Sequence, residues 1–454
     1  EFEIYLNPVL KNIESFKVVE DFCVQNLRRK IININTAKKF SKEWTKNFLK
    51  NSFHYIINRG VDSLINLLEG KFPVLIIGAG SSIDDNLNTI KRLSNYSLVI
   101  CVDTALIPIL KANIRVDIVV SSDSQSINAL YITQSDLVKK DLNNYPLLVC
   151  MPTVHPKLID KYKGKVLFSS LPFDLVKITD SLTIDRLEIG SGGTVSALAF
   201  EVAMIMNPSS IILFGTDFCY SNGKLHCNNA LFDSLYYGKT NYIYNYQTFI
   251  TMAMLRANSF LVINDYGLKT RTDPKFLMFL EWFKSQINKD DKIEVYYASK
   301  KTYGLSFLKY MGKAEIENFI YNKKNFNSMN FLSKIENIEF DKKNKIKIKE
   351  SYLDFLNKII IEGLSAKAMI ENIIKRIENT SFSDSVLMYL NTLERNLLGF
   401  SSLKTLLNMS FQEYLLSVQY EKKEIDTVSF YKNLLKKIDE ILILLRNMID
   451  KKSN

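Results

Sequence analysis

Two glycine-rich segments stand out in a chain of 454 residues that contains only 16 glycines. The first, residues 77–83, has the sequence Ile-Gly-Ala-Gly-Ser-Ser-Ile and follows a short aliphatic run. Closely spaced glycines allow a sharp turn and bring backbone N–H groups near a phosphate or a sugar. A dinucleotide-binding fingerprint has a third glycine where this chain has Ile83, so NAD is disfavoured. A plain strand-to-helix turn is the alternative. The candidate binding residues are Gly78, Gly80, Ser81 and Ser82.

The second glycine-rich segment, residues 188–196, has the sequence Glu-Ile-Gly-Ser-Gly-Gly-Thr-Val-Ser and precedes an alanine-rich apolar stretch. Free amides at a helix start, together with hydroxyl side chains, suit a nucleotide base, a ribose or a phosphate. The alternative is a packing turn in which Ser or Thr caps the helix. The candidate binding residues here are Ser191, Gly192, Gly193 and Thr194.

Two aspartates follow aliphatic runs between these segments. Asp103 lies about twenty residues beyond the first glycine turn, where an acidic side chain can accept hydrogen bonds from ribose hydroxyls. Asp123 follows the next run, but Ser122-Asp123-Ser124 is not the Asp-x-Asp arrangement that holds the metal of a nucleotide-sugar transferase. Five scattered cysteines and three histidines also argue against a metal centre. We therefore expect no metal and no cofactor.

The segment 211–226 combines an aliphatic run with polar residues that could act on a substrate. Asp217 and Tyr220 follow the run, at the carboxyl edge where open α/β sheets bind ligands. Asp217 could equally cap a helix or brace a loop, and Tyr220 is a candidate donor to a departing phosphate. An imidazole that titrates near neutral pH suits a general base, so His226 is the candidate, with His155 its main competitor. A surface loop histidine is the alternative for His226.

The elements that must position these residues alternate short apolar runs with helical patterns. Continuous runs rich in β-branched residues, without polar alternation, are typical of strands that are covered on both faces. Together with the intervening helices they predict a doubly wound, Rossmann-like α/β domain. The predicted strands are residues 74–77, 98–102, 116–120, 147–150, 166–168 and 211–214.

Three regions follow from this pattern. Residues 1–70 form an N-terminal region with one amphipathic helix, and residues 71–315 form the nucleotide-binding α/β domain. Residues 316–454 show helical spacing of Leu and Ile and predict an all-α bundle for docking or self-association. Within it, residues 342–349 are rich in lysine and are interpreted as a linker or an edge strand.

Composition restricts the partners. The chain has 59 basic and 48 acidic side chains and a net charge of +11. The lysines are scattered and not interleaved with aromatic residues, so we expect no nucleic-acid groove. The apolar runs are far shorter than the roughly 20 residues of a membrane span, and no leader is apparent. With unpaired cysteines, this favours the cytosol.

In order and spacing, these motifs resemble the motility-associated factor (Maf) glycosyltransferases, whose domain is also catalogued as similar to archaeal 6-hydroxymethylpterin diphosphokinases. The family usually has Gly-Pro-Ser-Leu where this chain has Gly80-Ser81-Ser82-Ile83. Residues 191–194 and 215–218 more distantly resemble the part of bacterial sialyltransferases that holds a CMP-activated sugar. The resemblance covers residues 40–310 and is carried by residues 72–83, 101–105, 116–123, 192–195 and 215–226.

The resemblance implies a metal-independent, inverting enzyme. It would transfer pseudaminic or legionaminic acid from a CMP donor to Ser or Thr of flagellin, with the C-terminal helices binding the acceptor. Two other functions stay open: a pterin diphosphokinase that uses ATP and Mg²⁺, and a non-catalytic nucleotide-binding scaffold.

Overall fold

The computed structural model describes residues 14–135, 145–190, 192–287, 293–321, 326–327, 331, 333, 342–379, 392, 395–396, 399–410 and 427–453. Ser191, a predicted binding residue, lies outside them. The chain divides into two compact units: Asn47–Asp354, and Glu1–Lys46 with Phe355–Asn454. The predicted domain limits near residues 70 and 315 stay a prediction.

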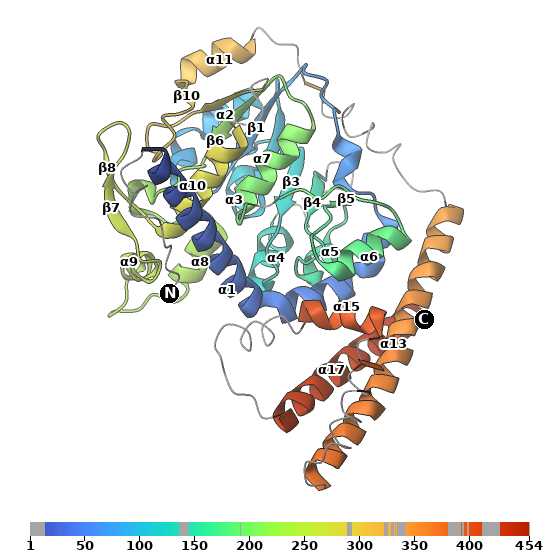
Figure 1. The fold of residues 1–454 in the computed structure, drawn as a ribbon. Coiled ribbons are helices and arrows are strands. Elements are labelled where there is room, and N and C mark those ends of the chain that lie inside the picture. The colour runs from blue at the N-terminus through green and yellow to red at the C-terminus, as the bar shows by residue number, and fades with distance from the viewer. Residues whose placement is uncertain are drawn as a thin grey trace. The chain divides into compact units, whose positions relative to one another are not determined.

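Unit Asn47–Asp354 is built on an eight-stranded sheet with the order β10-β9-β6-β1-β2-β3-β4-β5. All neighbouring strands are parallel, and helices flank the sheet (Figure 1). All five residues of β1, β2 and β6 are buried, as expected of aliphatic runs covered on both faces. The predicted α/β fold is confirmed. The strands are β1 (Pro73–Ile77), β2 (Leu98–Val102), β3 (Ile118–Ser121), β4 (Leu147–Cys150), β5 (Val166–Phe168), β6 (Ser210–Phe214), β9 (Glu294–Tyr297) and β10 (Lys309–Tyr310).

The remaining elements of this unit connect the strands. A separate antiparallel hairpin consists of β7 (Phe260–Ile263) and β8 (Lys269–Thr272). Short 3-10 helices are η2 (Val61–Leu64), η3 (Ser81–Asp85) and η6 (Ser221–Gly223). The α-helices are α2 (Leu87–Leu93), α3 (Asp103–Lys111), α4 (Ser126–Thr133), α5 (Pro156–Lys161), α6 (Asp174–Leu182), α7 (Val195–Ile205), α8 (Leu231–Tyr237), α9 (Tyr246–Arg256), α10 (Pro274–Ile287) and α11 (Lys313–Tyr321).

The other unit contains α15 (Ser401–Ser410), α17 (Thr427–Ser453), most of α13 (Lys342–Asn379) and most of α1 (Glu14–Ile57). The predicted helical C-terminal region is confirmed, but the lysine-rich linker at residues 342–349 is wrong because α13 starts at Lys342. Lys and Ile alternate in this segment, and such alternation is typical of an extended strand. In α13, Gly363 lets α17 approach closely, since a Cβ there would lie 2.8 Å from Leu442 Cδ2. None of the described helices is long and apolar enough to cross a membrane.

The order in which the chain adds strands to the sheet reverses at β1. From β1 the chain continues through α2 to β2 on one side, whereas β6 pairs with the other side of β1. In open α/β sheets, ligands bind outside the carboxyl ends of the strands at such a switch point. Ile77 pairs with Phe214 at the ends of β1 and β6, so the loops that follow these two strands start side by side.

Candidate functional site

The glycines after β1 allow its loop to contact the loop after β6. Gly80 N donates to Gly215 O at 2.8 Å. A Cβ on Gly78 would lie 2.4 Å from Gly215 O, and a Cβ on Gly80 would lie 2.5 Å from Asp217 Cγ and Oδ2. No side chain fits in these spaces. The structure thus shows a packing reason for both glycines, and their contact with a phosphate stays a prediction.

Asp217 is bound to the start of η3. Its Oδ2 accepts a hydrogen bond of 3.0 Å from Ser82 N, and its Oδ1 accepts one from the Ser82 hydroxyl. Ser81 Oγ donates to Ser221 O at 2.5 Å, which ties the same two loops together. Burial raises the pKa of the Asp217 carboxyl to about 6, against the lowering effect of the Ser82 hydrogen bonds. The helix start that was predicted to bind an anion therefore binds this carboxylate.

Asp103 is completely buried at the start of α3. Its carboxylate accepts hydrogen bonds from Ser121 Oγ at 2.7 Å, Thr104 N at 2.7 Å and Thr104 Oγ1 at 3.0 Å. Burial raises its pKa to about 6. The predicted direct contact with ribose does not fit this burial; Asp103 instead fixes Thr104. Asp123 is partly exposed and accepts a hydrogen bond of 3.0 Å from Gln125 N.

The second glycine segment adopts a left-handed turn against α10. Gly192 and Gly193 have φ angles of 50° and 81°, which favour glycine. A Cβ on Gly192 would lie 2.5 Å from the ring of Trp282, and one on Gly193 would lie 3.0 Å from Phe279 Cε1. Thr194 occupies the N-cap position of α7 but makes no side-chain cap hydrogen bond. The Thr194 side chain therefore does not cap α7, and its contact with a ligand stays a prediction.

A cavity of about 170 Å³ opens at the switch point, beside the ends of β1, β2 and β6. It brings together four of the predicted residues from distant parts of the chain, namely Gly80, Thr194, Asp217 and His226. The other predicted residues that the structure describes do not line it. Sequence reasoning did not single out the other twelve lining residues, and the two from α10, Phe276 and Phe279, had no motif that could have revealed them. The hydroxyl side chains among the twelve are Thr104, Ser196 and Thr216.

Two buried polar atoms of this cavity have no hydrogen-bond partner among the residues that the structure describes. They are Thr216 Oγ1 and His226 Nδ1. A buried polar atom without a partner costs about 1–3 kcal/mol, and a polar ligand or water that bonded to it would relieve this cost. Thr216 is 6% exposed and stands directly before Asp217. The cavity is therefore suited to a polar ligand.

His226 is neutral near pH 7. Its ring stacks on Phe232, with 5.2 Å between the centroids and 11° between the planes. Burial lowers its pKa to about 4. The expectation that it titrates near neutral pH is therefore wrong, because the sequence did not reveal the aromatic residues around it. Its competitor His155 caps α5 by accepting from Lys157 N at 3.3 Å and does not line the cavity.

Tyr220 points away from this cavity. Its hydroxyl donates to Asp273 Oδ2 at 2.6 Å, and its ring packs with Ile250, Met254 and Phe276. Burial and the Asp273 hydrogen bond raise its pKa. Since its proton is given to Asp273, the structure offers no support for Tyr220 as a donor to a departing phosphate. Among the described residues, no three His, Cys, Asp or Glu side chains are grouped as a metal site requires.

Comparison with known proteins agrees with this geometry. Residues 46–223 match the family model described as 6-hydroxymethylpterin diphosphokinase MptE-like. The fold is similar to that of the Maf glycosyltransferase from Magnetospirillum magneticum AMB-1, with a TM-score of 0.53 and 14% sequence identity. The resemblance to the Maf family is confirmed. The similarity covers 90% of this chain but only 59% of that protein, so this chain spans less than two thirds of its length. No curated protein matches the chain.

Proposed function

We propose that this chain is a glycosyltransferase that transfers a nonulosonic acid, of the pseudaminic or legionaminic type, from a CMP donor to Ser or Thr hydroxyls of flagellin. The observation that carries the proposal is the cavity at the switch point, which joins the start of α7 to Asp217 and His226. The similarity of the fold to a Maf glycosyltransferase supports the reaction class. We propose that the enzyme works in the cytosol and takes its CMP-activated sugar donor there.

The start of α7 is the part of the cavity best suited to the donor phosphate. The first N–H groups of an α-helix have no partner within the helix and attract an anion. Thr194 and Ser196 add hydroxyls there, and the unpartnered Thr216 Oγ1 adds a third. These donors can stabilise the departing CMP phosphate without a metal ion.

The transfer needs a base for the acceptor hydroxyl. As its oxygen attacks the anomeric carbon, its proton passes to the base, the bond from that carbon to the CMP phosphate oxygen breaks, and the electron pair leaves with CMP. His226 lines the cavity, its ring is neutral, and its Nδ1 has no partner in the described chain, so it is our choice. Asp217 is the alternative, but its carboxylate already accepts two hydrogen bonds from Ser82.

The family model itself favours a second candidate, a 6-hydroxymethylpterin diphosphokinase-like enzyme. Such an enzyme would transfer a diphosphate group from ATP with Mg²⁺. Calorimetry separates the two: we expect CMP to bind at least tenfold more tightly than ATP, about 1.4 kcal/mol. Tighter binding of ATP would reverse the order of the candidates.

A transfer assay tests the proposal directly. Purified flagellin is incubated with the chain and CMP-pseudaminic or CMP-legionaminic acid, and its intact mass is measured. We expect the mass to increase by whole sugar units. Binding of CMP without any change in mass would show a nucleotide-binding scaffold instead.

A further inference from the structure

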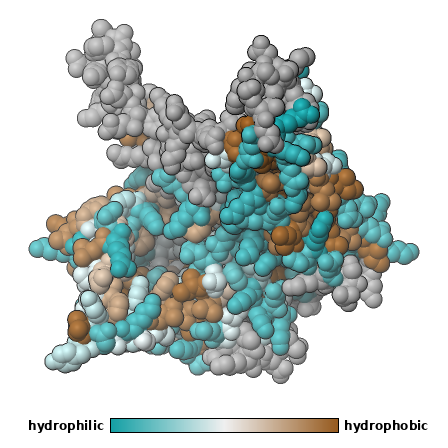
Figure 2. All heavy atoms as spheres, turned by 90° about the horizontal axis from the view of Figure 1, so that it is seen from below, coloured by the Kyte–Doolittle hydropathy of each residue, from teal (hydrophilic) through white to brown (hydrophobic). Residues whose placement is uncertain are grey.

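Exposed hydrophobic side chains are concentrated in one stretch of the chain. Of the 17 large hydrophobic side chains that are exposed in the described part of the chain, ten lie between Tyr237 and Leu268. This stretch contains α9 and most of the β7–β8 hairpin, at the left of Figure 1. Figure 2 shows brown, hydrophobic atoms among teal ones on that side too. Such a concentration is typical of an interaction surface.

The hairpin presents a face of mixed character to the solvent. Leu261 pairs with Arg271, and Ile263 pairs with Lys269. Directly opposed residues of antiparallel strands lie on the same face, so these four side chains share one face. Leu261 is 70% exposed and Ile263 is 65% exposed. The face therefore combines two aliphatic and two cationic side chains.

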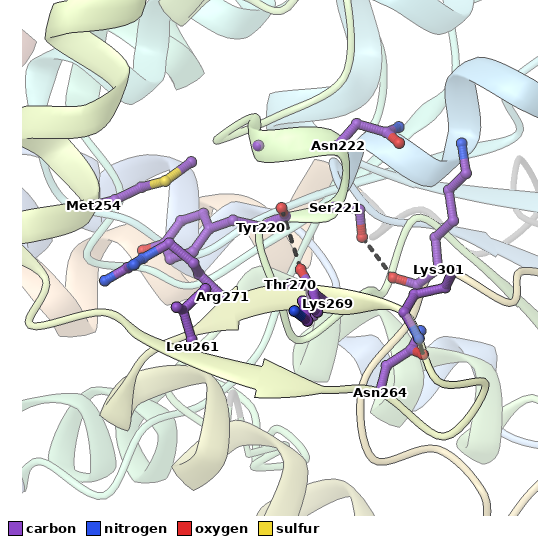
Figure 3. A pocket seen from close by; sticks show the side chains of 12 residues that line it. Tyr220, Ser221, Asn222, Met254, Leu261, Asn264, Lys269, Thr270, Arg271 and Lys301 are labelled. Carbon is purple, nitrogen blue, oxygen red and sulfur yellow. Dashed lines mark hydrogen bonds between the residues drawn. The ribbon is translucent and has the colours of Figure 1, made fainter.

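A cavity of about 470 Å³ adjoins this face (Figure 3). Its lining combines apolar, polar and cationic side chains. This arrangement suits an apolar side chain flanked by acidic groups. The apolar residues are Met254, Leu261 and Leu268, and the cationic ones are Lys269, Arg271 and Lys301.

The same loop borders this cavity and the catalytic one. Residues 217–219 line the catalytic cavity, and residues 220–223 line the cavity beside the hairpin. Strand β8 holds the loop in two ways. The Thr272 side chain, on the opposite face, donates from Oγ1 to Phe218 O at 2.8 Å, and at the outer edge of the strand Tyr220 N donates to Arg271 O at 2.8 Å. Strand β8 thus connects the hairpin face with the loop that contains Asp217.

One edge of strand β7 is not paired with another described strand. The strand pairs only with β8 among the described strands, and its sequence Phe-Leu-Val-Ile is entirely apolar. An exposed apolar edge strand is a template for pairing with another chain, and main-chain hydrogen bonds then supply affinity.

We propose that the β7–β8 hairpin and the adjoining cavity bind the acceptor polypeptide as an extended segment with apolar and acidic side chains. This inference rests on the proposed glycosyl transfer. The segment pairs with the free edge of β7. Its apolar side chain enters between Met254 and Leu261, and its acidic side chains face Lys269 and Arg271. The next residues of the segment then bring a hydroxyl to the catalytic cavity.

Kinetics with purified flagellin and a CMP-nonulosonic acid test this proposal. We expect Ile263→Asp and Lys269→Glu each to raise KM for flagellin about tenfold or more, equivalent to about 1.4 kcal/mol. The kcat at saturating flagellin and the affinity for CMP stay at the wild-type values. Two matched controls, Ile65→Asp and Lys157→Glu, change an exposed aliphatic and an exposed lysine elsewhere and leave KM unchanged. An unchanged KM in both hairpin variants would overturn the proposal.

A second measurement does not depend on turnover. Ile263→p-benzoylphenylalanine places a photo-crosslinker on the hairpin face, and we expect it to crosslink purified flagellin without any donor. Crosslinking without transfer would support acceptor binding at the hairpin and refute the proposed glycosyl transfer. Transfer without crosslinking, and with an unchanged KM in the hairpin variants, would support the glycosyl transfer and refute acceptor binding at the hairpin.

The same variants also test whether the hairpin binds a membrane or a second copy of this chain. Sedimentation with phosphatidylglycerol vesicles that is lost in Ile263→Asp would show a membrane surface. A dimer in light scattering that becomes a monomer in Ile263→Asp would show a self-association surface. Either result would overturn the assignment to the acceptor.

Discussion

The carboxylate of Asp217 accepts both polar hydrogens of Ser82, although the two residues are 135 positions apart in the chain. The carboxylate thereby occupies the start of η3, the helix start that follows the first glycine turn. A donor phosphate cannot use the same amide. In the proposed transfer, the phosphate is therefore bound elsewhere. The starts of α3 and α7 also line the cavity. At the start of α3, Thr104 N already donates to Asp103, which leaves the start of α7 for the phosphate.

This packing predicts opposite outcomes for two Gly→Ala variants. Gly80→Ala places a Cβ 2.5 Å from Asp217, whereas Gly190→Ala meets no atom within 4 Å. We expect Gly80→Ala to lower the free energy of unfolding by about 1–3 kcal/mol, the range for inserting a methyl group into a packed site. Gly190→Ala serves as the control and leaves it within about 0.5 kcal/mol. Urea denaturation measures both, and equal stability of the two variants contradicts the packing described for the loop after β1.

The buried carboxyl of Asp103 predicts a pH-dependent stability. Its pKa is about 6 in the folded protein and 3.8 in the reference state, so the folded state binds more protons between these values. Its ionised form thus destabilises the fold above pH 6, and this cost disappears as the pH falls toward 4. We expect Asp103→Asn to be more stable than wild type at pH 7.5 by up to about 3 kcal/mol, from two pKa units.

Chemical denaturation at pH 7.5 and at pH 4.5 measures this difference. The advantage of Asp103→Asn should shrink at the lower pH. Asp123→Asn, which removes a partly exposed charge, controls for the change in net charge. An Asp103→Asn advantage that is constant with pH would contradict the assigned burial effect.

The assignment of His226 as the general base predicts how His226→Ala changes the transfer rate and the CMP affinity. Loss of a general base typically lowers the rate about 10²–10⁴-fold and leaves binding intact. We expect that loss in sugar transfer, with a CMP affinity near that of wild type by calorimetry. If turnover stays within about threefold of wild type, far below that range, His226 is not the base, and Asp217 is the next candidate.

The pH–rate profile distinguishes these two bases. A base with a pKa of about 4, such as His226, stays active as the pH falls to 5. If Asp217 is the base, activity falls as the pH drops through about 6, because the carboxyl takes up a proton there. We expect the rate between pH 7.5 and pH 5 to change little.

Transfer should also survive chelation. Our mechanism stabilises the departing phosphate with the N–H groups of α7 and the hydroxyls of Thr194, Ser196 and Thr216. We expect the same transfer rate in excess EDTA as in Mg²⁺, measured by the mass of flagellin. Loss of transfer in EDTA that Mg²⁺ or Mn²⁺ restores would show that an ion takes part.

The sequence predicted the parallel sheet well because its central strands are continuous aliphatic runs, a strong local signal. Strands β9 and β10 were not predicted. Their residues include Glu294, Lys309 and several tyrosines, so they lack the signal of a strand buried on both faces. The helical start of α13 was missed for a similar reason, since its Lys and Ile residues alternate.

The candidate site was predictable only in part. Spacing placed Asp217 and Gly80 correctly at strand ends, but whether they meet a ligand or each other depends on contacts between distant segments. The same holds for His226, whose pKa is set by burial beside Phe232, and for Tyr220, whose partner Asp273 lies 53 residues away. Sequence distance hides such contacts.

Loop 215–223, which borders both cavities, contains Phe218 at a φ of 53°. A bulky residue pays about 1–2 kcal/mol for this left-handed conformation. Contacts of the loop must offset this cost, and one of them is the hydrogen bond from Thr272 Oγ1 to Phe218 O. A ligand in either cavity that shifted this loop would change the affinity of the other cavity, and each ligand would then change the affinity for the other by the same factor.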